Sequence, residues 1–103
     1  MKIMVDIDET ICYHDNNNGS RDYSCAIPYT NRIEKINTLY DEGNIIIYWT
    51  ARGTMTGINW FNTTLEQLNR WGCKFHELRM GKPAFDILID DSKVRPYMVG
   101  HSF

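Results

Sequence analysis

Cysteine, long apolar runs and excess positive charge are all scarce in this chain of 103 residues. The three cysteines are Cys12, Cys25 and Cys73, an odd number without C-x-x-C spacing, which argues against a disulfide framework and a zinc site. The longest unbroken apolar run, 45–49, has five residues, whereas a membrane-spanning helix needs about 20. The formal net charge of −2 disfavours non-specific nucleic-acid binding. We therefore expect no nucleic-acid or membrane partner.

The length fits a single domain spanning 1–103, and a hydrophobic content of 43% is ample for its core. The N-terminus enters an apolar segment at once and reaches Asp6, which is unlike a secretory signal. Free cysteines suit a reducing compartment, so we predict a cytoplasmic protein.

Short apolar segments alternate with segments of helical periodicity. Strands are predicted over 2–5, 45–49, 74–78 and 86–89. A first helix is expected to begin at Pro28 and stop at Gly43. The second is expected over about 57–71, with a buried stripe of Ile58, Phe61, Leu65, Leu68 and Trp71. The polar segment between Ile11 and Tyr29 reads as an extended loop or a short hairpin. This order predicts an α/β domain with a mostly parallel sheet of about four to five strands, flanked by helices.

Reactive polar residues follow the predicted strands. Asp6 and Asp8 come after the first, Thr50 after the second, and the pair Asp90-Asp91 after the last, with Lys82 just before that last strand. Because parallel strands bring their carboxyl ends to one edge, Asp6, Asp8, Thr50 and Asp90 are expected to converge there.

The residue types suit phosphoryl transfer. Clustered carboxylates repel one another, and a hard cation such as Mg²⁺ relieves that repulsion through oxygen ligands. Thr50 can donate a hydrogen bond to a phosphate oxygen, and Lys82 supplies positive charge. Taken singly, each has a plainer explanation: Asp8 as a turn residue, Asp90-Asp91 as a helix cap, Thr50 as a strand-end hydroxyl and Lys82 as a solvated charge. Their joint order favours the catalytic interpretation.

The segment Asp6-Ile-Asp8-Glu-Thr10, together with Thr50, Lys82 and Asp90-Asp91, resembles the four signature motifs of the haloacid dehalogenase-like (HAD) superfamily of phosphatases. Gly81-Lys82-Pro83, closely followed by Asp90-Asp91, resembles the small capsule-biosynthesis-type phosphatases of that group. The resemblance covers residues 1 to about 95 and implies a minimal Rossmann-like core.

The resemblance also implies roles. Asp6 would be the nucleophile that forms an aspartyl-phosphate, and Asp8 the general acid and base. Thr50 and Lys82 would bind the phosphoryl oxygens. Mg²⁺ would be held by the side chain of Asp6, the backbone carbonyl of Asp8, and Asp90, with Asp91 assisting directly or through water. The sequence does not decide whether Asp90 or Asp91 binds the metal ion directly, although Asp90 is favoured. The substrate would be a small phosphorylated metabolite, with a sugar phosphate as one candidate.

The chain departs from many members of the superfamily because it has no room for a cap domain. The 11–30 segment is long enough for a flap only, and about 96–103 forms a C-terminal tail. Arg52, just past Thr50, could bind substrate phosphate or a sugar carboxylate, or it could simply pair with a nearby acid. Flap residues such as His14 and Tyr23 could contact the leaving group, although a solvated loop position is the simpler expectation for each.

Two other functions remain open. A receiver-type phosphoacceptor module also uses acids, a Thr or Ser and a Lys around Mg²⁺, but its phosphoacceptor lies on a middle strand, where this chain has Thr50. A catalytically idle interaction protein could keep the same fold. An open site, together with Trp60, Phe61, Tyr97, Met98 and Phe103, further suggests a homo-oligomer in which a neighbour borders each site.

Overall fold

The computed structural model describes residues 1–15 and 22–83. Its elements are β1 (Lys2–Asp6), β2 (Cys12–Tyr13), the 3-10 turn η1 (Tyr23–Cys25), β3 (Ile27–Pro28), α1 (Thr30–Asp41), β4 (Ile45–Trp49), α2 (Phe61–Arg70) and β5 (Glu77–Arg79). The predicted strand over 86–89, the pair Asp90-Asp91 and the predicted tail lie outside the described residues.

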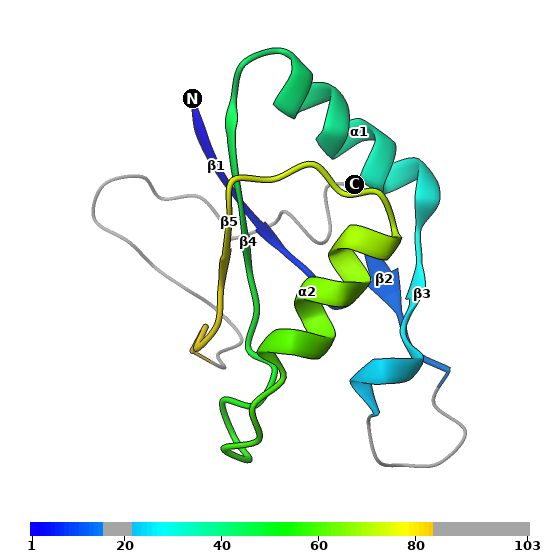
Figure 1. The fold of residues 1–103 in the computed structure, drawn as a ribbon, viewed down its shortest axis with the longest axis vertical. Coiled ribbons are helices and arrows are strands. Elements are labelled where there is room, and N and C mark those ends of the chain that lie inside the picture. Colours follow the sequence, from blue (N-terminus) through cyan, green and yellow to red (C-terminus); the bar gives the residue numbers. More distant parts are fainter. Residues whose placement is uncertain (16–21, 84–103) are drawn as a thin grey trace.

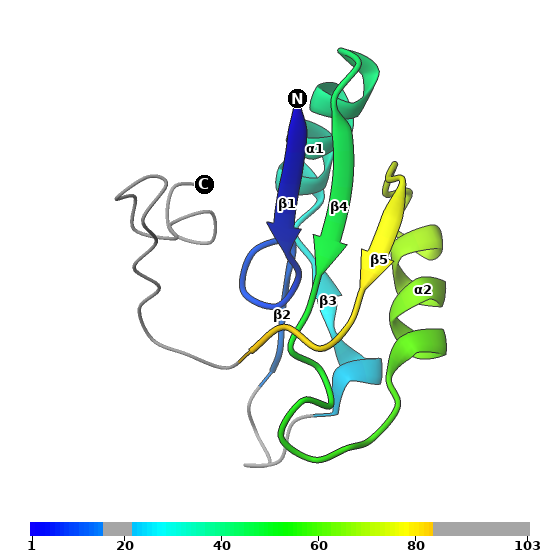
Figure 2. The same cartoon turned by 90° about the vertical axis from the view of Figure 1, so that its left-hand side faces the viewer.

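The main sheet is parallel, as predicted, with the strand order β1-β4-β5. Lys2 pairs with Ile45 at one end of the β1–β4 ladder and Asp6 pairs with Trp49 at the other. The three strands run in the same direction, so their carboxyl ends meet at one edge of the sheet (Figure 2). Within the described residues this sheet has three strands, fewer than the predicted four to five.

The central strand β4 is buried because its side chains are apolar: Ile46, Ile47 and Tyr48 are at most 2% exposed. Both helices lie on the same side of the sheet (Figure 1). The core between the sheet and these helices comprises Val5, Ile7, Ile11, Cys12, Ala26, Ile33, Ile36, Ile46, Tyr48 and Leu68. Among the described residues, no helix has both the length and the apolar character needed to cross a membrane.

The segment between β1 and α1 forms the predicted short hairpin, in which Tyr13 of β2 pairs antiparallel with Ile27 of β3. The predicted start of the first helix was wrong. Pro28 belongs to β3, opposite Cys12, and the helix begins at Thr30. A proline is tolerated in so short a strand because few ladder hydrogen bonds are lost. The predicted stop at Gly43 fits, since α1 ends at Asp41 and Gly43 takes a φ of 96°.

The second helix also begins later than predicted, at Phe61. Gly57 has a φ of 76°, which is outside the helical region, and the side chain of Asn59 accepts a hydrogen bond from the Phe61 backbone N–H at 3.0 Å. Residues 53–60 therefore form a loop, on which Ile58 is 55% exposed. The expected burial of Ile58 and Phe61 was wrong, since Phe61 is itself 38% exposed.

The buried residues of α2 are Thr64, Gln67 and Leu68. Thr64 and Gln67 are polar, and both accept hydrogen bonds from the side chain of Arg52, which lies just after β4. The predicted apolar stripe placed Leu68 inside correctly but could not reveal that polar residues share the buried face. The third predicted strand, expected over 74–78, is also later and shorter, since β5 covers Glu77–Arg79.

Candidate active site

A tight turn follows β1 and sets the positions of Asp6 and Asp8. The N–H of Ile11 donates to the carbonyl of Ile7 at 2.9 Å, and the N–H of Glu9 donates to the carbonyl of Cys12 at 2.8 Å. Glu9 has a φ of 64°, an uncommon value for a residue with a side chain, and such backbone is frequent at functional sites. The turn keeps the two aspartates at the carboxyl edge of the sheet.

Asp6 and Lys82 meet at this edge. The Lys82 Nζ lies 3.4 Å from Asp6 Oδ1, with side chains 13% and 29% exposed respectively. Burial raises the pKa of the Asp6 carboxyl, although the charge of Lys82 opposes that rise. Burial thus disfavours the charged form of Asp6, and the ammonium group of Lys82 favours it.

Thr50 follows β4 directly and is hydrogen-bonded both to the end of β5 and to the segment after it that carries Lys82. Its N–H donates to the carbonyl of Arg79 at 3.0 Å, and its carbonyl accepts from the N–H of Lys82 at 3.0 Å. Its hydroxyl oxygen accepts from the N–H of Arg52 at 3.0 Å, which leaves the hydroxyl hydrogen able to donate. Because Thr50 is fully buried, a phosphoryl oxygen could reach that hydrogen only after a small movement of the surrounding loops.

The carboxylate of Asp8 is hydrogen-bonded to the side chains of Arg52 and His14. Arg52 Nη2 donates to Oδ1 at 2.9 Å, and Arg52 Nε lies 3.2 Å from Oδ1 and 3.1 Å from Oδ2. His14 Nε2 lies 2.7 Å from the same Oδ1. Burial alone would raise the pKa of Asp8, but the hydrogen bonds and charges of Arg52 and then His14 outweigh it and hold the pKa below its usual value. Oδ1 is therefore crowded with donors, while Oδ2 has capacity left.

Arg52 is itself enclosed, with a side chain that is 0% exposed. Its Nη1 donates to Thr64 Oγ1 at 3.1 Å and to Gln67 Oε1 at 2.6 Å. The Tyr23 ring lies 4.8 Å from the guanidinium carbon. This arrangement favours a role in positioning Asp8. Direct contact between Arg52 and substrate stays a prediction.

His14 is not a solvated loop residue, because its side chain is only 4% exposed. The residue follows β2, and its ring packs edge-on against Tyr23 with centroids 5.5 Å apart. A lone histidine in a polar segment carries no local signal for such a contact. The one relevant feature of the sequence is the separation of six residues between Asp8 and His14, because a short hairpin can bring two such side chains together.

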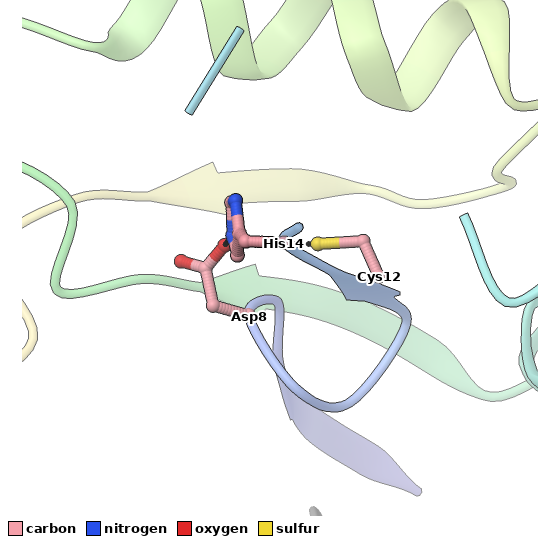
Figure 3. A group of neighbouring side chains, drawn as sticks. All are labelled: Asp8, Cys12 and His14. Atoms are coloured by element: carbon pink, nitrogen blue, oxygen red, sulfur yellow. Dashed lines mark hydrogen bonds and ion pairs between the residues drawn. The ribbon is translucent and has the colours of Figure 1, made fainter. Parts of the chain in front are cut away.

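Asp8, Cys12 and His14 point toward one another (Figure 3), with one ligand atom from each lying within 4.8 Å of the others. A soft metal ion would need the thiolate of Cys12, yet burial and then the charge of Asp8 raise the pKa of that thiol to about 12. The guanidinium of Arg52 also contacts both Asp8 and Cys12. We therefore interpret this group as a hydrogen-bonded network.

The donors that suit a hard cation lie on the other side of the turn. The carboxylate of Asp6 beside a backbone carbonyl matches the oxygen ligands of Mg²⁺. The other predicted ligands, Asp90 and Asp91, lie outside the described residues. The magnesium site therefore stays a prediction.

No protein-family profile and no curated protein matches the chain. Among solved structures, the chain is similar to a crystal structure from Vibrio cholerae described only as an MCSG target. The two agree with a TM-score of 0.73 and 26% sequence identity, over 97% of this chain and 87% of the other. The similarity supports the small α/β fold, and that description names no function.

Proposed function

We propose that this protein is a Mg²⁺-dependent phosphomonoester hydrolase built on the capless core of the HAD superfamily. The observation that carries the proposal is the pairing of Asp6 with Lys82 at 3.4 Å, at the carboxyl edge of a parallel sheet. A carboxylate nucleophile beside an ammonium group suits attack on a phosphoryl group, because the ammonium offsets the charge of the incoming oxygens. We also propose that the sheet has four to five strands, the additional ones being formed by residues outside the described part of the chain.

The first step forms a bond between an Asp6 carboxylate oxygen and phosphorus while the bond from phosphorus to the leaving oxygen breaks. The leaving oxygen takes a proton from Asp8 and departs as an alcohol. In the second step Asp8 accepts a proton from water, and the water oxygen attacks the aspartyl-phosphate. Inorganic phosphate leaves and the Asp6 carboxylate is restored.

Asp8 transfers these protons through Oδ2, because Oδ1 already receives bonds from His14 and Arg52. The lowered pKa of Asp8 keeps it ionised before substrate arrives. Asp8 can take up the proton for the leaving oxygen from a substrate monoanion, and the proton that Asp8 takes from water in the second step passes to the departing phosphate or to the next leaving oxygen. The ionised carboxylate is then ready to accept a proton from water in the second step.

Thr50 and Lys82 would bind the phosphoryl oxygens. Mg²⁺, bound by Asp6, the carbonyl of Asp8, and Asp90 with Asp91, would supply further positive charge for the phosphoryl group.

A screen of small phosphomonoesters with Mg²⁺ and detection of free phosphate tests this function. Sustained turnover that includes generic aryl phosphates supports the hydrolase. Stoichiometric phosphorylation from a small phosphodonor without turnover would instead support a receiver-like module. A protein that gives neither would fit an idle interaction protein.

The proposed homo-oligomer rests on exposed apolar side chains near the site, of which Phe61 is one. Tyr97, Met98 and Phe103 lie outside the described residues. Light scattering at assay concentration measures the assembly directly.

A further inference from the structure

A small pocket opens where β4 and β5 end, beside the residues proposed to bind phosphate. It is lined by residues 52–54, 58–60 and 80–81, and its volume is about 170 Å³. The first of these segments begins two residues after Thr50, and the last precedes Lys82 directly. The pocket therefore shares its walls with the candidate active site.

The loop that forms one wall is folded closely on itself. Gly53 has a φ of 79°, and a β-carbon there would overlap the carbonyl oxygen of Ile58 and press on the indole of Trp60. The N–H of Gly57 closes the turn by donating to the carbonyl of Gly53 at 2.8 Å. The Trp60 ring is held from behind by Tyr23, in an edge-to-face contact with centroids 5.1 Å apart. These contacts hold the Trp60 ring in place as one wall of the pocket.

The Arg52 guanidinium, the Thr54 hydroxyl and the Asn59 side-chain oxygen, all in the pocket wall, already have partners. Arg52 is bonded to Asp8, Thr64 and Gln67. Thr54 Oγ1 donates to the carbonyl of Lys82 at 3.0 Å, and Asn59 Oδ1 accepts from the N–H of Phe61 at 3.0 Å. The remaining side chains are apolar: Ile58, Trp60 and Met80. A group that enters would meet an indole ring, an aliphatic side chain and a thioether.

These walls favour an aromatic ring over a sugar. Each hydroxyl that is desolvated without a partner costs about 1–3 kcal/mol, and a sugar ring carries several of them. An apolar ring gains from burial and from stacking on tryptophan. The volume also fits, since an apolar cavity of roughly 150 Å³ is known to bind benzene.

We propose that this pocket receives the leaving group of the substrate, and that this group is a single aromatic ring on an aryl or arylmethyl phosphate. The inference rests on the proposed phosphomonoesterase function and names its substrate class. It also explains why Ile58, an apolar residue on a loop, is kept 55% exposed at the pocket.

The test compares benzyl phosphate with glucose 6-phosphate and glycerol 3-phosphate. All three release a primary alcohol, so differences in kcat/KM report recognition rather than leaving-group ability. We expect wild-type kcat/KM to be at least tenfold higher for benzyl phosphate, as is usual for one well-fitted apolar group. Equal values, or a preference for glucose 6-phosphate, would overturn the proposal.

Two pocket variants sharpen the test. Trp60→Leu removes the stacking wall, and Ile58→Asn changes an exposed side chain without risk to the core. Each should raise KM for benzyl phosphate roughly tenfold and leave glycerol 3-phosphate unchanged. Met55→Asn is the matched control, because Met55 is 83% exposed on the same loop and does not line the pocket. Pocket variants that affect both substrates equally would contradict the assignment.

A binding readout separates this proposal from the proposed function. The indole N–H signal of Trp60, assigned with Trp60→Leu, is followed by NMR during titration with benzylphosphonate and with methylphosphonate. A shift with the benzyl compound alone supports the pocket even if no substrate turns over, whereas turnover without that shift overturns the pocket and leaves the hydrolase standing.

Discussion

The guanidinium of Arg52 lies against the carboxylate of Asp8, with Nη2 2.9 Å from Oδ1 and Nε 3.1 Å from Oδ2. The arginine side chain is 0% exposed and that of the aspartate 15% exposed. A charge pair so enclosed costs a great deal when one member is removed, because the other charge stays buried without a partner.

Replacing Arg52 with Met should therefore lower the free energy of unfolding by about 3–5 kcal/mol in urea titrations. The double variant Arg52→Met with Asp8→Asn should lose clearly less than the sum of the single losses, since neither charge is left behind. Additive losses would mean that the two side chains are not coupled in solution.

His14 should matter for catalysis through its bond to Oδ1 of Asp8. We expect His14→Leu to slow hydrolysis of alkyl phosphates by roughly tenfold or more, because their leaving groups need a proton from a well-oriented acid. An aryl phosphate with a good leaving group should be affected much less. His14→Gln, which keeps a donor near the position of Nε2, should restore part of the rate. A uniform loss across leaving groups that glutamine does not rescue would point to a purely structural role.

Removal of the metal ion should abolish phosphomonoester hydrolysis. Among the described residues the structure pairs Asp6 with Lys82, and one ammonium group cannot offset both a carboxylate and a phosphate dianion, so excess chelator should abolish turnover and Mg²⁺ should restore it. Ca²⁺ should restore it poorly, because its longer and looser coordination misplaces the nucleophile. Full activity in excess chelator would remove the metal from the mechanism.

The cysteines should differ in reactivity. Burial raises the pKa of Cys12 to about 12 and that of Cys73 to about 11, so both are neutral thiols at pH 8, while Cys25 is exposed. Iodoacetamide at pH 8 should therefore modify Cys25 first, and the other two only in denaturant. Mass spectrometry of tryptic peptides measures this. Fast labelling of Cys12 in folded protein would show that the network around Asp8 is open in solution.

Much of the fold follows from the sequence, because apolar runs such as 45–49 mark buried parallel strands. The placement of Asp6, Asp8 and Thr50 at one edge could be anticipated for the same reason: parallel strands deliver their ends to one edge. Both inferences need only local patterns and a general rule of topology.

The surroundings of Asp8 could not be predicted. Periodicity assigns polar residues such as Thr64 and Gln67 to the solvent side of a helix, and only the buried guanidinium of Arg52 reverses that assignment. Burial of a charge depends on partners far apart in the sequence, which no local pattern encodes. Ile58 was wrongly predicted to be buried. Its spacing matches the helical pattern, but it lies in a loop, where Gly57 has a φ of 76°.

The central claim is that Asp6 carries the phosphoryl group during turnover. The most direct measurement is mass spectrometry of protein quenched in acid during turnover of an active phosphomonoester with Mg²⁺, for wild type and for Asp6→Asn. We predict one added phosphoryl group on the wild-type peptide that contains Asp6. The variant should carry none and should lose several orders of magnitude in kcat, because an amide cannot attack phosphorus. Near-wild-type turnover by Asp6→Asn, or phosphate trapped on a different residue, would contradict the account.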